Sequence, residues 1–190
     1  MHASLIQYLQ QFKILNTEEK AIIQESFQLV QYKAGETLSL AGKVTQKLFF
    51  IAEGILKITI PNNEIRDHAY FFMEENQFMS FLYSMYENIP AEQGLEASHD
   101  SIVMQIDKKG LFILFEKLPF FRALIDKIAH LTMVDMINTK NMYLSVKSSD
   151  RYAKLLLHQP ALVKYVPLID IASYLGITAQ SLSRIRKSVH

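Results

Sequence analysis

The chain has 190 residues, with 20 basic and 19 acidic side chains and a formal net charge of +1. Its hydrophobic fraction of 49% is enough for the core of one or two domains and excludes a disordered chain, and the absence of cysteine excludes disulfides, thiolate catalysis and cysteine-ligated clusters. No apolar run approaches the ~20 residues of a membrane helix, and residues 1–12 lack the pattern of a secretory signal peptide, so we expect a cytoplasmic protein.

The first part of the chain changes from helical to strand-like patterning. Apolar side chains at helical spacing over residues 4–29 predict two helices, the second starting at Asn16 or Thr17. From residue 31 to 107 the apolar runs are short, rich in β-branched and aromatic residues, and separated by glycines. We expect strands at residues 37–42, 47–60, 68–72 and 102–106. Many short strands at this spacing predict an antiparallel β-roll or jelly roll.

A long helix is expected from Pro119 to about residue 145, because proline suits the first turn of a helix. Leu124, Ile128 and Leu131 form a seam spaced by four and three residues, and further apolar side chains widen it. A helix with so much apolar surface needs cover on two sides. One interpretation is simply a helix buried within its own domain.

Residues 147–150 are the expected hinge, with Ser149 or Asp150 capping a helix over 151–158 that ends before Pro160. The segment after the hinge is basic. Residues 148–190 hold six basic and two acidic side chains, a net charge of +4, which leaves −3 for the rest of the chain. This asymmetry suits a partner with a phosphate backbone at the C-terminal end.

Residues 167–187 predict two short helices joined by a tight turn. Gly176 stands where the first helix must stop, because glycine reaches positive φ cheaply, and Thr178 is the expected cap of the second helix. Apolar residues at helical spacing are expected to face inward: Ile169, Ala172, Leu175, Leu182 and Ile185. This is the helix-turn-helix pattern, and an αα-hairpin with a solvated outer face is the alternative.

The residue spacing over 167–187 resembles the DNA-binding domain of the CRP/FNR family of bacterial transcription regulators, and its SYLGIT..SLSRIRK variant resembles Bacteroidetes-type members. Residues 33–38, Gly42 and residues 49–54 resemble the glycine-punctuated pattern of cyclic-nucleotide-binding domains. The resemblance implies an α+β protein with a sensor domain like a cyclic-nucleotide-binding or cupin-like β-roll (residues 1–117), a dimerisation helix and hinge (118–147) and a helix-turn-helix DNA-binding domain (148–190).

By this resemblance, Ala179, Gln180 and Arg184 occupy the base-reading positions of the recognition helix. Glutamine pairs with adenine and arginine with guanine, each through two hydrogen bonds, whereas Ala179 replaces an arginine of the family and removes one guanine contact. Phosphate contacts are expected from Thr178, Ser181, Ser183, Arg186 and Lys187. For Arg186 and Lys187, the alternative is a charged last turn that complements the helix dipole.

The resemblance also implies a homodimer that binds a two-fold symmetric double-stranded DNA operator. The long helix would pair with its copy through Leu124, Ile128 and Leu131, mainly in its first half, because polar residues interrupt the second half. Its other side would pack on the roll. Such a dimer holds two recognition helices about 34 Å apart.

Relatives that bind cyclic AMP use a Gly-Glu pair for the ribose and an arginine followed by Ser or Thr for the phosphate. In this chain Ser80 and Phe81 stand where Gly-Glu is expected, and Ala91 and Glu92 stand roughly where the arginine pair is expected. A buried phosphate needs a cationic partner. We therefore expect that cyclic AMP does not bind in the usual way.

The region offers almost no cation to replace that arginine. No lysine or arginine lies between Arg66 and Lys108, so only Arg66 or Lys57 could swing in. The candidate pocket residues are Phe72, Phe78, Met79, Ser80, Phe81, Leu82, Ala91 and Glu92. Two interpretations stay open: these side chains fill the vacated pocket, or they line a site for an unknown small-molecule effector of apolar character.

Other chemistry has weaker support in the sequence. The six histidines form no HxH or HExxH spacing, and no GxSxG, P-loop or GxGxxG motif is present, so we expect no metal, no cofactor and no enzymatic activity. Haem held by a single histidine, as in some relatives, stays an alternative. Two rival functions are a ligand-binding module that acts through protein contacts and a metal-dependent jelly-roll enzyme, for which His68 and His99 are a weak ligand pair.

Overall fold

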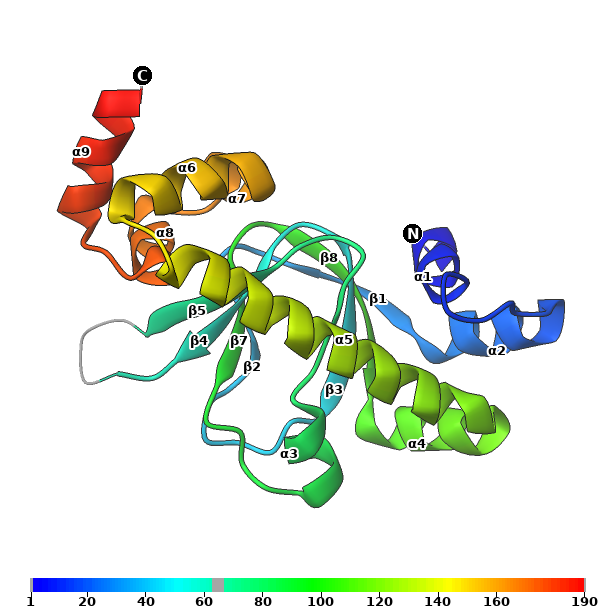
Figure 1. Ribbon diagram of the computed structural model, residues 1–190. Coiled ribbons are helices and arrows are strands. Elements are labelled where there is room, and N and C mark those ends of the chain that lie inside the picture. The colour runs from blue at the N-terminus through cyan, green and yellow to red at the C-terminus, as the bar shows by residue number, and fades with distance from the viewer. Residues whose placement is uncertain (1, 63–66, 190) are drawn as a thin grey trace.

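A computed structural model describes residues 2–62 and 67–189 of the chain. Within them an antiparallel β-roll lies between a pair of N-terminal helices and a group of C-terminal helices, and one long helix runs along it (Figure 1). This order confirms the predicted α+β class. No helix in these residues has both the length and the apolar character that a membrane span needs.

The strands of the roll are β1 (Gln28–Tyr32), β2 (Thr37–Ser39), β3 (Lys47–Glu53), β4 (Leu56–Ile60), β5 (His68–Met73), β6 (Phe78–Met79), β7 (Gly94–Ala97) and β8 (Ser101–Asp107). They form two four-stranded antiparallel sheets, with the orders β1-β8-β3-β6 and β2-β7-β4-β5. Gly54 turns β3 into β4 at φ +99°, where a Cβ atom would collide with the backbone of Asp100 and Ser101. The glycine-punctuated strands that the sequence predicts are therefore confirmed.

The N-terminal helices are α1 (His2–Leu9) and α2 (Thr17–Ser26). Asn16 caps α2: its Oδ1 accepts from the Glu19 N–H at 2.8 Å, and the Glu19 carboxylate accepts from the Asn16 N–H at 2.8 Å. The predicted helical region is too long, because Phe27 is already extended and β1 follows directly. Pairing of β1 with β8 along its whole length overrides the helical spacing of its apolar residues.

Three further helices are α3 (Leu82–Glu87), which lies between β6 and β7, and α4 (Lys108–Lys117) and α5 (Pro119–Leu144), which follow β8. Pro119 is the first residue of α5, as its sequence position predicts. The helix α4 was not expected from the sequence. It begins at the end of β8, where the Asp107 carboxylate accepts from the Gly110 N–H at 2.7 Å.

The C-terminal helices are α6 (Ser148–His158), α7 (Pro160–Tyr165), α8 (Leu168–Leu175) and α9 (Ala179–Val189). The expected start of α6 is wrong, because Ser149 and Asp150 already lie inside its first turn. The N–H of Arg151 bonds the carbonyl of Lys147 at 2.9 Å, and no side chain caps this helix.

Buried side chains form two clusters. One joins the roll to α1, α2, α4 and the first half of α5. The other runs from the roll into the C-terminal helices and includes Phe72, Tyr143 and Tyr174. Because this second cluster continues past the expected hinge, the C-terminal helices are packed on the roll as well as tethered to it. The domain limits drawn from the sequence stay a prediction.

Candidate nucleic-acid interface and ligand pocket

The turn between α8 and α9 has the geometry of a helix-turn-helix. Gly176 adopts φ +66°, and the N–H of Ile177 bonds the carbonyl of Ala172 at 3.0 Å, which closes the end of α8. Thr178 caps α9, because its Oγ1 accepts from the Ser181 N–H at 3.1 Å. The prediction that Ile169 faces inward is wrong: its side chain is 50% exposed in the first turn of α8, and Ile171 is buried instead.

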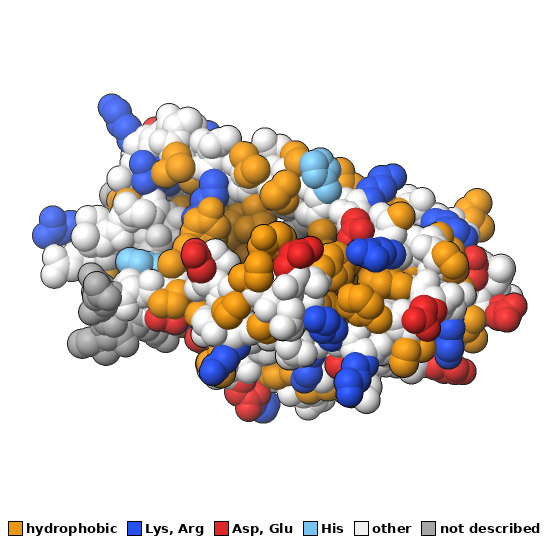
Figure 2. Space-filling model, turned by 90° about the horizontal axis from the view of Figure 1, so that it is seen from below, with side chains coloured by type: hydrophobic (Ala, Val, Ile, Leu, Met, Phe, Trp, Pro, Cys, Tyr) orange, Lys and Arg blue, Asp and Glu red, His pale blue; other side chains and the backbone are white. Residues whose placement is uncertain are grey.

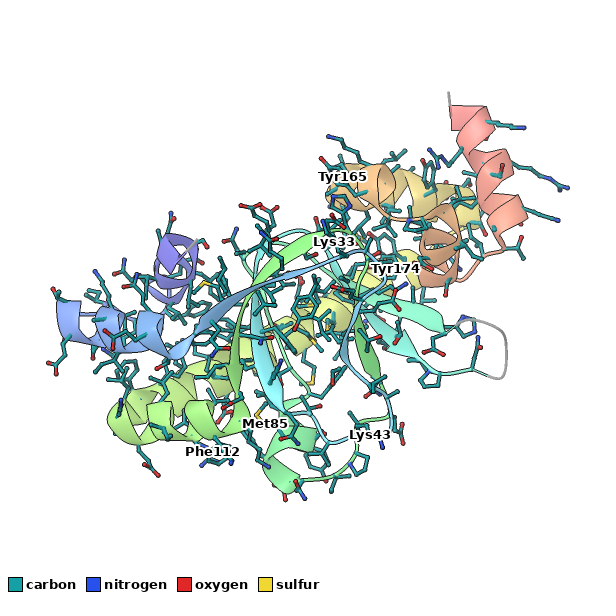
Figure 3. All side chains as sticks on the ribbon, turned by 180° about the vertical axis from the view of Figure 1, so that it is seen from behind. Lys33, Lys43, Met85, Phe112, Tyr165 and Tyr174 are labelled. Atoms are coloured by element: carbon teal, nitrogen blue, oxygen red, sulfur yellow. The ribbon has the colours of Figure 1, made fainter. Side chains whose placement is uncertain are left out.

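The two faces of α9 are clearly different. Leu182 is fully buried and Ile185 packs beside it, which fixes the rotation of the helix. Gln180, Ser181, Arg184 and Lys187 are exposed on the outer side, with Ala179, Ser183 and Arg186 partly exposed. The helix stands at one end of the molecule, and its side chains extend away from the rest of the protein (Figures 1 and 3).

The cations of α9 are not neutralised by neighbouring carboxylates. In the described part of the chain, Arg184, Arg186 and Lys187 form no ion pair. The hydroxyls of Thr178 and Ser181 bond each other at 2.9 Å at the start of the helix. The outer face therefore offers an amide, hydroxyls and unneutralised cations on a rigid helix.

A buried ion network joins α8 to the roll. Lys57 on β4 is 4% exposed, and its Nζ lies 2.8 Å from both Glu96 on β7 and Asp170 on α8. Lys57 is thus committed to this network and is not the cation that a cyclic phosphate would need. Arg66, the other candidate for that role, lies outside the described residues.

Gln159, between α6 and α7, connects three parts of the molecule. Its Oε1 accepts from the hydroxyls of Tyr143 and Tyr174 at 2.9 Å each, and its Nε2 donates to Glu74 at 3.0 Å. Burial raises the pKa of Tyr174 well above its ordinary value, so the phenol stays a donor. Phe72 packs edge-on against Tyr174 with 5.1 Å between ring centroids. The label on Tyr174 in Figure 3 marks this junction.

A cavity of about 330 Å³ lies between the roll and α5. The underside of the molecule has a recess in which hydrophobic side chains gather (Figure 2). Five of the eight candidate pocket residues line the cavity: Phe78, Met79, Ser80, Phe81 and Leu82. Sequence reasoning missed the wall that α5 supplies, which comprises Ile125, Ala129, Thr132, Met133 and Met136.

The other three candidate pocket residues lie outside the lining. Phe72 faces Tyr174, as described above. Ala91 is buried in a loop, and its N–H donates to the carbonyl of Lys43 at 3.0 Å. Glu92 is exposed. These three residues do not line this cavity, and their part in binding an effector stays a prediction.

The expected seam of α5 is also corrected in part. Leu124 and Ile128 are 7% and 1% exposed, because α1 and α4 join the roll in covering the first half of the helix. Leu131 is 45% exposed. The other exposed apolar side chains of α5 lie in its second half: Met133, Val134, Ile137 and Leu144. A partner helix would therefore meet the second half and not the first.

The two histidines considered for a metal lie in packing contacts. His68 Nδ1 is 3.2 Å from the Ser173 hydroxyl, and His99 stacks on Tyr165 with 4.6 Å between ring centroids. Among the residues that the structure describes, no three His, Asp or Glu side chains converge to hold a metal ion.

An antiparallel roll, a long helix and a C-terminal helix-turn-helix together define the fold of CRP/FNR-type regulators. The global regulator CLP of Xanthomonas campestris, described as c-di-GMP responsive, aligns with a TM-score of 0.70 at 14% identity over 92% of this chain and 91% of that chain. FixK2 of Bradyrhizobium japonicum aligns with a TM-score of 0.67 at 16% identity over 86% and 84% of the two chains.

A CooA mutant of Carboxydothermus hydrogenoformans aligns with a TM-score of 0.64 at 14% identity over 97% of this chain and 83% of that chain. No protein-family model and no curated protein sequence matches the chain. At these identities the structural likeness establishes the fold, which confirms the predicted architecture.

Proposed function

We propose that the chain is a sequence-specific, double-stranded-DNA-binding transcription regulator that acts as a homodimer in the cytoplasm. The observation that carries the proposal is the outer face of α9. This helix is capped by Thr178 and anchored by the buried Leu182, and it presents Gln180, Arg184 and Lys187 with no carboxylate partner among the described residues. A helix of this kind enters the major groove and reads base edges with its first turns.

The residues of α9 divide into two proposed roles. Gln180 reads adenine and Arg184 reads guanine, each through a pair of hydrogen bonds, while Ala179 offers only a methyl group to thymine. Thr178, Ser181, Ser183, Arg186 and Lys187 contact phosphates, which position the helix without reading sequence. Operator preference then depends mainly on Gln180 and Arg184.

The homodimer is proposed to form through the exposed side of α5. His130, Val134, Ile137, Asn141 and Leu144 are exposed and spaced by four and three residues, the repeat of a two-stranded coiled coil. An asparagine at one such position fixes the register and the number of helices at some cost in stability. This stripe replaces the Leu124–Ile128 part of the seam, which the protomer buries.

Cyclic AMP is not the proposed effector. Among the described residues that line the cavity, none is basic, and Lys57 is held by Glu96 and Asp170. An anionic phosphate would lose its hydration without gaining a cationic partner. Titration calorimetry with cyclic AMP is expected to give no saturable heat, and micromolar binding in the roll would contradict this.

DNA binding is tested by fluorescence anisotropy of labelled genomic duplexes at several salt concentrations. The affinity is expected to fall linearly with salt on logarithmic axes, because phosphate contacts release counterions. A ligand-binding module that acts only through protein contacts would bind no DNA at any salt concentration. The variant Arg184→Ala/Lys187→Ala should lose binding, whereas Lys108→Ala/Lys109→Ala on α4 removes the same charge and should not.

A further inference from the structure

The cavity between the roll and α5 has walls without charge. The turn from β6 into α3 forms one side and α5 the other, and among the described residues every lining side chain is apolar or uncharged. This recess opens to solvent, and its volume of about 330 Å³ lies at the lower end of the ~300–1,000 Å³ range of small-molecule pockets.

Neither nearby cation points its charge into this space. Lys57 directly precedes Ile58, which lines the cavity, but its ammonium is bound by Glu96 and Asp170. Lys140 lies over the rings of Tyr70 and Tyr174, 4.6 Å from each centroid, and its Nζ donates to the Tyr174 carbonyl at 3.4 Å. An anion in the cavity would consequently be desolvated without an opposite charge.

The lining does supply hydrogen-bonding groups that carry no charge. Ser80 and Thr132 have hydroxyls on opposite walls, and Gln93 brings an amide. The Ser80 hydroxyl donates to the Lys47 carbonyl at 2.9 Å, so its oxygen keeps its capacity to accept. Met79, Met133 and Met136 surround them with flexible, polarizable surface that adapts to different apolar shapes.

We propose that this cavity binds one uncharged, mainly apolar small molecule that carries a hydroxyl, carbonyl or amide group. The binding site follows from the cavity itself, and its role as an effector site rests on the proposed function. Met133 and Met136 lie on α5 beside Val134 and Ile137 of the dimer stripe. A bound molecule thus touches the helix that connects the roll to the DNA-binding helices.

The probe for this site is the uncharged dye N-phenyl-1-naphthylamine, whose fluorescence rises in apolar surroundings. We expect saturable binding of one dye per chain to the full-length protein. Ala129→Phe places a ring in the cavity and should weaken dye binding by about tenfold or more. Ala123→Phe adds the same ring on the exposed side of α5, outside the lining, and should change affinity by less than about twofold.

Competition then distinguishes the chemical class. The alcohol 1-nonanol should displace the dye, whereas nonanoate should compete about tenfold more weakly and cyclic AMP should not compete. Equal competition by nonanoate, or any by cyclic AMP, would overturn the proposal. So would an unchanged affinity in Ala129→Phe, or dye binding that disappears as the protein dimerises, since a second copy would then fill the cavity.

Two controls separate this inference from the others. Thermal unfolding checks that Ala129→Phe is folded, and Thr132→Met narrows the cavity more gently if it is not; its dye affinity should also fall. A wild-type chain that binds duplex DNA but no dye overturns the ligand site alone. A chain that binds the dye but no DNA retains the ligand site and overturns the proposed function.

Discussion

At the scale of single residues, Arg184 has both an exposed position on α9 and a guanidinium group that can donate two hydrogen bonds to one base. Leu182, two positions earlier and on the opposite face of α9, is fully buried, so the guanidinium is held on the outer side of the helix with no ion pair in the described residues. The Thr178 cap and the inward Leu182 were readable from the sequence, because both follow from local geometry. Ile169 was not, because its exposure depends on how α8 docks on the roll.

The variant Arg184→Ala should lose about 1–3 kcal/mol of binding free energy on a preferred duplex and relax the preference at one base pair. The loss on unrelated duplexes should be smaller. Arg122→Ala, which removes an exposed arginine from α5, is the matched control. Anisotropy on preferred and scrambled duplexes measures both, and an equal loss on every sequence would refute a base-reading role.

Lys187→Ala should behave differently, because a phosphate contact carries no sequence information. Binding should weaken to the same extent on all duplexes, and the slope of log affinity against log salt should fall by about one per subunit. A full salt titration of the variant beside the wild type gives that slope. If the slope does not change, Lys187 only complements the helix dipole.

Burial lowers the pKa of Lys140 to about 8 from its ordinary 10.5. Between these values the unfolded chain holds a proton that the folded chain has released, so the free energy of unfolding should rise with pH from about 8 to about 10. Above about 10 the raised pKa of Tyr174 acts in the opposite direction.

Urea unfolding at about pH 7.5 and about pH 9.5 measures this change. The rise in unfolding free energy should be smaller in Lys140→Met, which has no ammonium to titrate. Tyr83→Phe, at an exposed phenol on α3, controls for the loss of an unrelated titratable group. The same rise in Lys140→Met as in the wild type would mean that this lysine is not responsible.

At the scale of elements, the packing of α8 on the roll organises the C-terminal half. Phe72 meets Tyr174, and Lys57 reaches Asp170 across 113 positions of sequence. Local sequence patterns do not predict contacts between residues so far apart in the chain. The sequence therefore predicts a place in the effector pocket for Phe72 and not its contact with Tyr174. The same reason explains α4 and the burial of Leu124 and Ile128: cover by distant helices does not appear in the spacing of one helix.

The Lys57 network should matter more than a surface ion pair. Lys57→Met removes the buried cation that Glu96 and Asp170 share and should cost about 3–5 kcal/mol of unfolding free energy. Lys33→Met breaks a solvent-screened, exposed pair with Asp100 and should cost far less than Lys57→Met. Urea denaturation compares them.

A double variant completes that comparison. Adding Asp170→Asn to Lys57→Met removes one of the two carboxylates that Lys57 neutralises and should restore part of the lost stability. Equal costs for Lys57→Met and Lys33→Met, or no recovery in the double variant, would contradict the assigned role of the network.

At the scale of the whole molecule, the glycine-punctuated strands, the long helix and the final helix pair were enough to predict the α+β architecture. Their order along the chain was more informative than any single motif. The side of α5 that stays open could not be predicted, because it depends on where α1 and α4 pack. Because Val134, Ile137 and Leu144 are exposed, we propose that the dimer contact lies there.

Ile137→Asp should convert the dimer to monomers, because it places two carboxylates in an apolar seam. Leu157→Asp on α6 replaces an exposed apolar residue outside the stripe and should leave the dimer intact. Sedimentation velocity distinguishes the two species. A wild-type chain that is already monomeric, or an unaffected Ile137→Asp, would remove α5 from the interface.

The most direct test is selection of bound sequences from a pool of random duplexes by the purified full-length protein. A dimer that reads DNA with two copies of α9 should enrich a two-fold symmetric site whose half-sites are centred about 10–10.5 base pairs apart. Enrichment of no sequence, or of a single asymmetric site by a monomer, would contradict the proposed mode of recognition.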